Sequence, residues 1–303
     1  MIKDLYGVIP VLSTPMDANG SLDLKILEKE IRWVKSHKIH SIATGMVSEI
    51  LRMDKEERKT LTQSVCDIAK ELSMNVVVSC GQESTRATIS LVHHAEKVGA
   101  TAVMINPPIS TKLSSQETYQ FFRDIFIDST ISIIVQDASG YVGNAIDINI
   151  LKTLLNEFEN RIYFKPEAIP IGQKLSLLRD STGGRARIFE GTGGAHLVDS
   201  FTRGIVGTMP GTDICWAIIQ LWEALVNKDW DTINLINGPV ANMVNLLSSL
   251  DAYIAIEKHL LKLQGVFTNT YQKYPSGFKL DNETQTEAER IFAYLKILNK
   301  GGA

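Results

Sequence analysis

Cysteine is scarce in this sequence of 303 residues. Its three cysteines, Cys66, Cys80 and Cys215, are odd in number and far apart. They form neither a disulfide framework nor the close spacing of a cysteine zinc site. This pattern is typical of buried, reduced thiols in a reducing compartment, so we expect a cytoplasmic protein.

Long apolar runs and an excess of one charge are also missing. No run approaches the ~18 apolar residues that span a bilayer, and residues 1–10 lack the apolar core of a signal peptide. Lysine and arginine number 31 against 34 acidic residues, for a net charge of -3. Without a dense basic cluster, neither nucleic acid nor a membrane surface is indicated as a partner. We therefore expect a small-molecule partner.

Metal-ligand patterns are missing as well. His196 has no histidine or carboxylate at ligand spacing, and the adjacent His93 and His94 face different ways on a helix. The glycine-rich segment GTGGAH (191–196) could cradle a phosphate, but it has no Walker-type lysine. A glycine turn between a strand and a helix is the simpler interpretation. We expect neither a metal nor a cofactor.

Short β-branched runs recur along most of the chain. They cover residues 6–13, 40–45, 75–81, 101–107, 131–137, 161–165, 187–193 and 204–211. Most gaps between them carry apolar residues three and four apart, which predicts amphipathic helices. Alternating strands and helices predict a parallel sheet, and eight such units predict an α/β fold of the (β/α)8 TIM barrel type over residues 1–211.

The last ninety or so residues contain helical patterns only. We predict helices over 212–227, 229–264 and 284–299. No linker rich in proline, glycine or serine precedes them. Residues 212–303 are therefore predicted to be a helical extension packed on the barrel, within a single structural unit.

Polar residues gather at the predicted carboxyl ends of the strands, where TIM barrels carry their reacting groups. In the sixth run, RIYFKPEA (161–168), Lys165 and Glu167 point the same way because side chains alternate along a strand. One interpretation is a solvated ion pair at a strand end, worth ~0–1 kcal/mol. The other is a reactive amine with a carboxylate beside it, able to form an imine and then move protons.

Several segments resemble one family of barrels. They are GVIPVLSTPMDANGSLD at the start, ATGMVSEILRMDKEER after the second strand, Lys165 on the sixth strand and the helical tail. Together they resemble the dihydrodipicolinate synthase and N-acetylneuraminate lyase family of Schiff-base barrels, over nearly the whole chain. The resemblance implies that Lys165 forms the imine and that the protein is a homo-oligomer, a tetramer in that family.

The chain also departs from the family pattern. Met46 and Val47 stand where the family usually has two threonines, and Gln136 stands at the position of the family's tyrosine. Tyr141 corresponds to an arginine of the synthase, and Ile109 to an aromatic residue contributed across a subunit interface. In that family, one of the two threonines and the tyrosine are the ends of a proton relay. Both ends are replaced here, by Met46 and by Gln136.

The combination of Gln136, Lys165 and Glu167 resembles the branch typified by L-2-keto-3-deoxyarabonate dehydratase. That resemblance implies a Schiff-base lyase that dehydrates a 2-keto-3-deoxy sugar acid to a semialdehyde, with these three residues as the catalytic set. Two alternatives stay open: a pyruvate-dependent aldolase or synthase-like condensation, and a barrel that binds a keto acid without turnover.

We also predict which residues contact the substrate. The predicted substrate-binding residues are Val47, Ser48, Gly191, Thr192 and Thr208. The backbone amides of Val47 and Ser48 would hold the substrate carboxylate.

Overall fold

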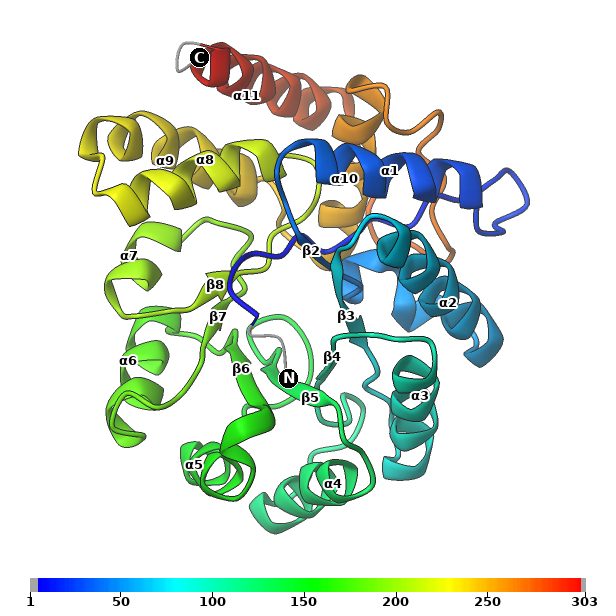
Figure 1. Cartoon of the computed structure of the whole chain (residues 1–303). Helices are drawn as coiled ribbons and strands as arrows, with labels where there is room; N and C mark the ends of the chain where they lie inside the picture. The colour runs from blue at the N-terminus through cyan, green and yellow to red at the C-terminus, as the bar shows by residue number, and fades with distance from the viewer. Residues whose placement is uncertain (1–4, 301–303) are drawn as a thin grey trace.

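The computed structural model describes residues 5–300. Strands form a central ring with helices around it (Figure 1). The strands are β1 (Gly7–Val8), β2 (Ser41–Ala43), β3 (Asn75–Ser79), β4 (Ala102–Ile105), β5 (Ser132–Asp137), β6 (Ile162–Pro166), β7 (Phe189–Glu190) and β8 (Gly207–Thr208). The helices that alternate with them are α1 (Leu24–Ser36), α2 (Lys55–Glu71), α3 (Thr85–Lys97), α4 (Ser115–Ile127), α5 (Ile148–Phe158), α6 (Ile171–Ser181), α7 (Leu197–Thr202) and α8 (Cys215–Asn227).

All strand pairs are parallel. Strands β2 to β6 pair in chain order, and β1, β8 and β7 form a second ladder. Bridges from Val11 to Ala43 and from Phe164 to Ile188 join the two ladders. The predicted TIM barrel is confirmed. Strands β1 and β8 are shorter than predicted, because Pro10 and Pro210 have no N–H to continue a ladder.

The barrel interior and its outer wall are two separate hydrophobic cores. Tyr163 and Ile134 point inward, whereas Phe164 belongs to the core between strands and helices. Because side chains alternate along a strand, Gln136 and Lys165 are the next inward positions of β5 and β6. These two residues are also paired in register. The fold therefore brings both side chains to the same level at the carboxyl end of the barrel.

Polar caps set the start of several helices. Asp23 caps α1, and Asp54 and Glu57 form a reciprocal capping box at α2. The charged segment DKEERK (54–59) is thus the start of a helix. The three cysteines are buried and free.

The C-terminal part is helical, but one predicted helix is two. Helix α8 is followed by α9 (Trp230–Asn245), α10 (Leu250–Leu263) and α11 (Asn282–Lys300). The single helix predicted over 229–264 is wrong, because the extended backbone of Ser249 ends that run. The Ser249 hydroxyl accepts from the Ala252 N–H at 3.1 Å and so begins α10.

The apolar faces of the C-terminal helices share one core with the helices of the barrel. Figure 1 shows α8, α9 and α10 against one side of the ring and α11 beyond them. Within residues 5–300, no helix has the length and apolar character needed to cross a bilayer.

Candidate active site

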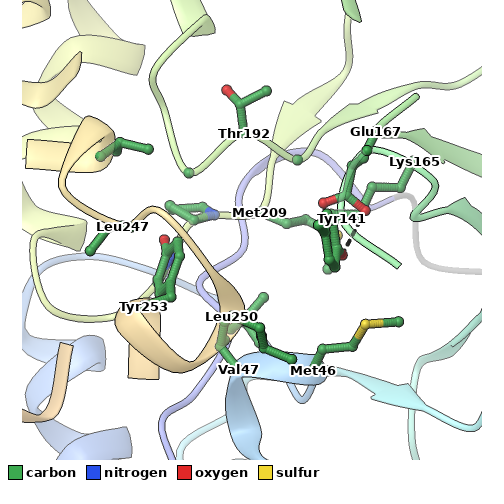
Figure 2. Close-up of a pocket in the computed structure, with 18 of the residues that line it drawn as sticks. Met46, Val47, Tyr141, Lys165, Glu167, Thr192, Met209, Leu247, Leu250 and Tyr253 are labelled. Atoms are coloured by element: carbon green, nitrogen blue, oxygen red, sulfur yellow. Dashed lines mark hydrogen bonds and ion pairs between the residues drawn. The ribbon is translucent and has the colours of Figure 1, made fainter. Parts of the chain in front are cut away.

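A cavity of about 320 Å³ opens at the carboxyl ends of the strands. Strand-end residues of the barrel form one side of it, and the α9–α10 connection forms the other (Figure 2). Among the described residues that line it, Lys165 is the only cationic side chain and Glu167 the only carboxylate. Most of the remaining wall is apolar.

Lys165 and Glu167 form a buried ion pair. Lys165 Nζ lies 2.9 Å from Glu167 Oε1, and the two residues are only 4% and 5% exposed. The solvated surface pair considered above does not describe this geometry. A carboxylate in contact with the amine can accept its proton, which imine formation requires.

Gln136 contacts the same carboxylate from β5. Its Nε2 donates to Glu167 Oε2 at 2.7 Å. Its Oε1 is buried and has no hydrogen-bond partner among the described residues. A buried acceptor without a partner is costly, so a ligand that donates to it is favoured. This oxygen is therefore available to a hydroxyl of a bound substrate or to water.

Tyr141 completes the group and was not among the predicted catalytic residues. Its hydroxyl donates to Glu167 Oε2 at 3.2 Å and accepts from Gln136 Nε2 at 3.0 Å (Figure 2). It lies in a turn closed by its own N–H to the Ala138 carbonyl. A Cβ on Gly140 would lie 2.2 Å from the Glu167 carbonyl oxygen, so only glycine lets the turn pack there. The sequence signal was the glycine–tyrosine pair directly after β5.

Burial raises the pKa of both the Glu167 carboxyl group and the Tyr141 hydroxyl. It raises the pKa of Glu167 above its usual value, while Lys165, Gln136 and Tyr141 act in the opposite direction by favouring the charged form. Burial of the phenol, together with the nearby Glu167 charge, raises the pKa of Tyr141 well above its usual value. The tyrosine therefore keeps its proton at neutral pH.

The predicted substrate-binding residues fall into two sets. Val47, Gly191 and Thr192 line the cavity. Ser48 and Thr208 do not; Ser48 Oγ donates to the Leu12 carbonyl at 2.5 Å, and Thr208 Oγ1 donates to Glu190 Oε2 at 2.5 Å.

The backbone N–H of Ser48, predicted to hold the substrate carboxylate, is already used in a hydrogen bond within the protein. The Ser48 N–H already donates to the Gly45 carbonyl at 3.0 Å. The Thr192 hydroxyl is likewise engaged, because it donates to Glu190 and accepts from the His196 N–H at 3.1 Å. Of the two predicted amide donors, Val47 is the one left for a ligand.

Gly191 has a role that the sequence did not indicate. A Cβ at this position would lie 2.6 Å from Cγ, Cδ and Oε1 of Glu167. The absence of a side chain makes room for the carboxylate beside Lys165.

The far wall of the cavity comes from the C-terminal helices. Leu247, Leu250 and Tyr253 face the barrel mouth from the α9–α10 connection and the start of α10 (Figure 2). The Tyr253 hydroxyl accepts from the Gly211 N–H at 3.1 Å. Sequence reasoning missed these residues because their position depends on how the extension packs.

Buried charges join this extension to the barrel. Lys258 of α10 forms an ion pair with Glu49, and both side chains are fully buried. Thr212, four residues after the end of β8, donates through Oγ1 to Glu30 at 2.7 Å and through N–H to Glu257 at 2.7 Å. Within residues 5–300, no group of three or more histidine, cysteine or acidic side chains is arranged to hold a metal.

The chain is similar in sequence to known proteins. The family model described as the dihydrodipicolinate synthetase family matches residues 4–294. A 4-hydroxy-tetrahydrodipicolinate synthase of Chlorobaculum parvum is 27% identical over 270 residues, with 88% of this chain and 90% of that protein covered. Another, of Bartonella quintana, is 29% identical over 181 residues, which span 59% of this chain and only 60% of that relative.

Solved structures are similar as well. The 4-hydroxy-tetrahydrodipicolinate synthase of Methylacidiphilum fumariolicum has a TM-score of 0.89 at 19% identity, with 97% of each chain covered. A prophage protein of the dihydrodipicolinic acid synthase family from E. coli K12, solved with pyruvate, has a TM-score of 0.88 at 20% identity, covering 96% of this chain and 99% of that one. At these identities the similarity shows the shared fold.

Proposed function

Because the chain belongs to the dihydrodipicolinate synthetase family, a family of lyases, we propose that it is a Schiff-base lyase that dehydrates a 2-keto-3-deoxy sugar acid. A 2-keto-3-deoxy pentonate, giving a keto-acid semialdehyde, is the substrate we favour. The observation that carries this proposal is the placement of Glu167. Its carboxyl group contacts Lys165 through one oxygen and Gln136 through the other.

The first step is formation of an imine on Lys165. Glu167 accepts a proton from the amine at 2.9 Å, and the neutral nitrogen attacks the keto carbon C2. Glu167 returns this proton to the C2 hydroxyl, which leaves as water; an iminium that draws electrons from C3 remains, and Glu167 is again a carboxylate. The substrate carboxylate is held by the backbone N–H of Val47, and Thr192 lines the same cavity.

Elimination follows from the iminium. Glu167 removes a proton from C3, and the resulting enamine expels the hydroxyl on C4 when an acid protonates it. The raised pKa of Glu167 suits this carboxyl group to work first as a base and then as a proton source. The unpartnered Gln136 Oε1 accepts a hydrogen bond from a substrate hydroxyl or from water. Hydrolysis of the imine releases the unsaturated keto acid, which tautomerises to the semialdehyde.

Aldol cleavage to pyruvate and an aldehyde is the second candidate. It needs a base on the C4 hydroxyl, and the titratable oxygens of Glu167 and Tyr141 lie in the same cavity. The replacement of the family's relay threonine by Met46 and of its tyrosine by Gln136 favours dehydration instead. The third reading is a barrel that binds a keto acid and does not turn it over.

One set of assays separates these functions. A panel of 2-keto-3-deoxy pentonates and hexonates is incubated with the protein, and both pyruvate and semialdehyde are measured. Semialdehyde without pyruvate supports dehydration, and stoichiometric pyruvate shows an aldolase. A trapped imine with neither product shows a protein that binds the keto acid without turnover. Borohydride reduction with pyruvate should label the peptide that contains Lys165. Glu167→Gln should still give that label, more slowly because water must then take the amine proton, and should lose elimination by ~100-fold or more.

A further inference from the structure

Tyr141 contacts the proposed reaction centre without a role in the steps above. Its hydroxyl is hydrogen-bonded to Glu167 and to Gln136, at 3.2 and 3.0 Å. The turn that carries it is packed against the end of β6, because Gly140 has no Cβ to keep it away. The phenol is therefore held in place by the backbone as well as by its hydrogen bonds.

Few groups can exchange a proton with Glu167. Oε1 is bonded to Lys165, and Oε2 accepts from Gln136 and from Tyr141. An amide does not titrate near neutral pH, and the lysine nitrogen is consumed once the imine forms. In the intermediate, Tyr141 is thus the acid that remains in hydrogen-bond contact with Glu167 among the described residues.

The order of these groups matches the order of the substrate carbons. Lys165 contacts Glu167 through Oε1, and Tyr141 contacts it through Oε2, so the tyrosine hydroxyl lies one contact further from the lysine nitrogen. In a bound 2-keto-3-deoxy acid, C4 lies one carbon further from the imine than C3. A base at C3 beside Lys165 and an acid at C4 beyond it is the order in which Glu167 and Tyr141 occur.

We propose that Tyr141 is the catalytic acid that protonates the departing C4 hydroxyl, with Glu167 returning the proton to it. This inference rests on the proposed function and extends it. The C3–H bond breaks and its proton passes to Glu167. The C3 electrons form the C3–C4 double bond as the C4–O bond breaks, and the hydroxyl takes the Tyr141 proton and leaves as water. The Glu167 proton then passes to the phenolate oxygen over the 3.2 Å hydrogen bond, and both residues regain their starting state.

The test separates hydroxyl departure from the earlier steps. Exchange of pyruvate methyl protons in D2O needs the imine and the C3 base but no leaving group. Tyr141→Phe should therefore keep borohydride labelling and methyl exchange near wild-type rates, while dehydration of the keto-deoxy acid falls by ~100-fold or more. With 4-chloro-2-oxobutanoate, chloride leaves without a proton, so the variant should release chloride at nearly the wild-type rate.

The control is a second tyrosine–glutamate pair. Tyr119 donates to Glu157 at the protein surface, away from the cavity, so Tyr119→Phe should leave every rate unchanged. Wild-type dehydration by Tyr141→Phe would overturn the inference, as would equal losses of methyl exchange and dehydration. Failure of the proposed function looks different: the wild-type protein itself would then form no imine or would release pyruvate.

Discussion

Replacing Gly191 by alanine tests the placement of Glu167 without changing a polar group. The new Cβ would lie 2.6 Å from three atoms of the Glu167 side chain, whereas ordinary carbon contacts are ~3.5–4.0 Å. The carboxylate must therefore move by about 1 Å. It cannot do so and keep its contacts of 2.9 Å with Lys165 and 2.7 Å with Gln136.

A displacement of this size is costly for catalysis. Misplacing a catalytic group by about 1 Å lowers rates by roughly 100-fold, and we expect that loss in kcat for Gly191→Ala. The backbone at Gly191 is not left-handed, so alanine adds no backbone strain. The melting temperature should fall, because the displaced carboxylate weakens a buried ion pair, and the drop reports that displacement rather than a strained backbone.

The assay compares kcat, pyruvate methyl exchange and thermal melting in two variants. Gly238 of α9 is the matched control, since its Cβ would meet no atom within 4 Å and its backbone is helical. Gly238→Ala should keep full activity, because its Cβ lies far from Glu167. Wild-type kcat and exchange in Gly191→Ala would refute the reasoning that Glu167 must stay beside Lys165.

Three further predictions follow from the cavity, the buried acids and the family. Burial raises the pKa of Glu30 to about 8, so its stabilising effect is complete below about pH 4.5 and is lost as the pH rises through about 8. Glu30→Gln should reduce the decline of the unfolding free energy with pH over this interval by up to ~1.4 kcal/mol per pH unit. Unfolding free energies from urea melts that fall with pH as steeply in the variant as in the wild type would contradict this. A substrate with a distal phosphate should show at least ~10-fold lower kcat/KM, because Lys165 is the only cationic side chain lining the described cavity and an unpaired buried charge is costly; equal kcat/KM for both forms would be evidence against this. We also expect a homo-oligomer, and light scattering from a monomer at micromolar concentration would argue against it.

Local patterns in the sequence were enough to predict the architecture. Strand and helix periodicity is set by residues close in the chain, and the regular alternation of the two leaves few arrangements besides a parallel barrel. The same local rule put Lys165 and Glu167 on one face, because side chains alternate along a strand. Consecutive strands pair, which brought Gln136 of β5 beside Lys165 of β6.

Only the tertiary structure decided which polar groups are free to act. A strand-end position did not reveal that Ser48 is bonded to Leu12 or that Thr208 is bonded to Glu190. Nor did it reveal the break before Ser249, which depends on a cap rather than on apolar spacing.

The remaining parts of the site come from segments whose positions are not set locally. Tyr141 reaches Glu167 through a turn that packs closely on the next strand, and Tyr253 enters the cavity from a helix beyond the barrel. The buried pair of Glu49 and Lys258 joins residues 209 positions apart. Periodicity reports which face of an element is buried, whereas these contacts depend on which elements meet and how closely. For that reason the sequence determined the barrel and its lysine, whereas the packing of the turn after β5 decided the position of Tyr141 and the packing of the C-terminal helices decided that of Tyr253.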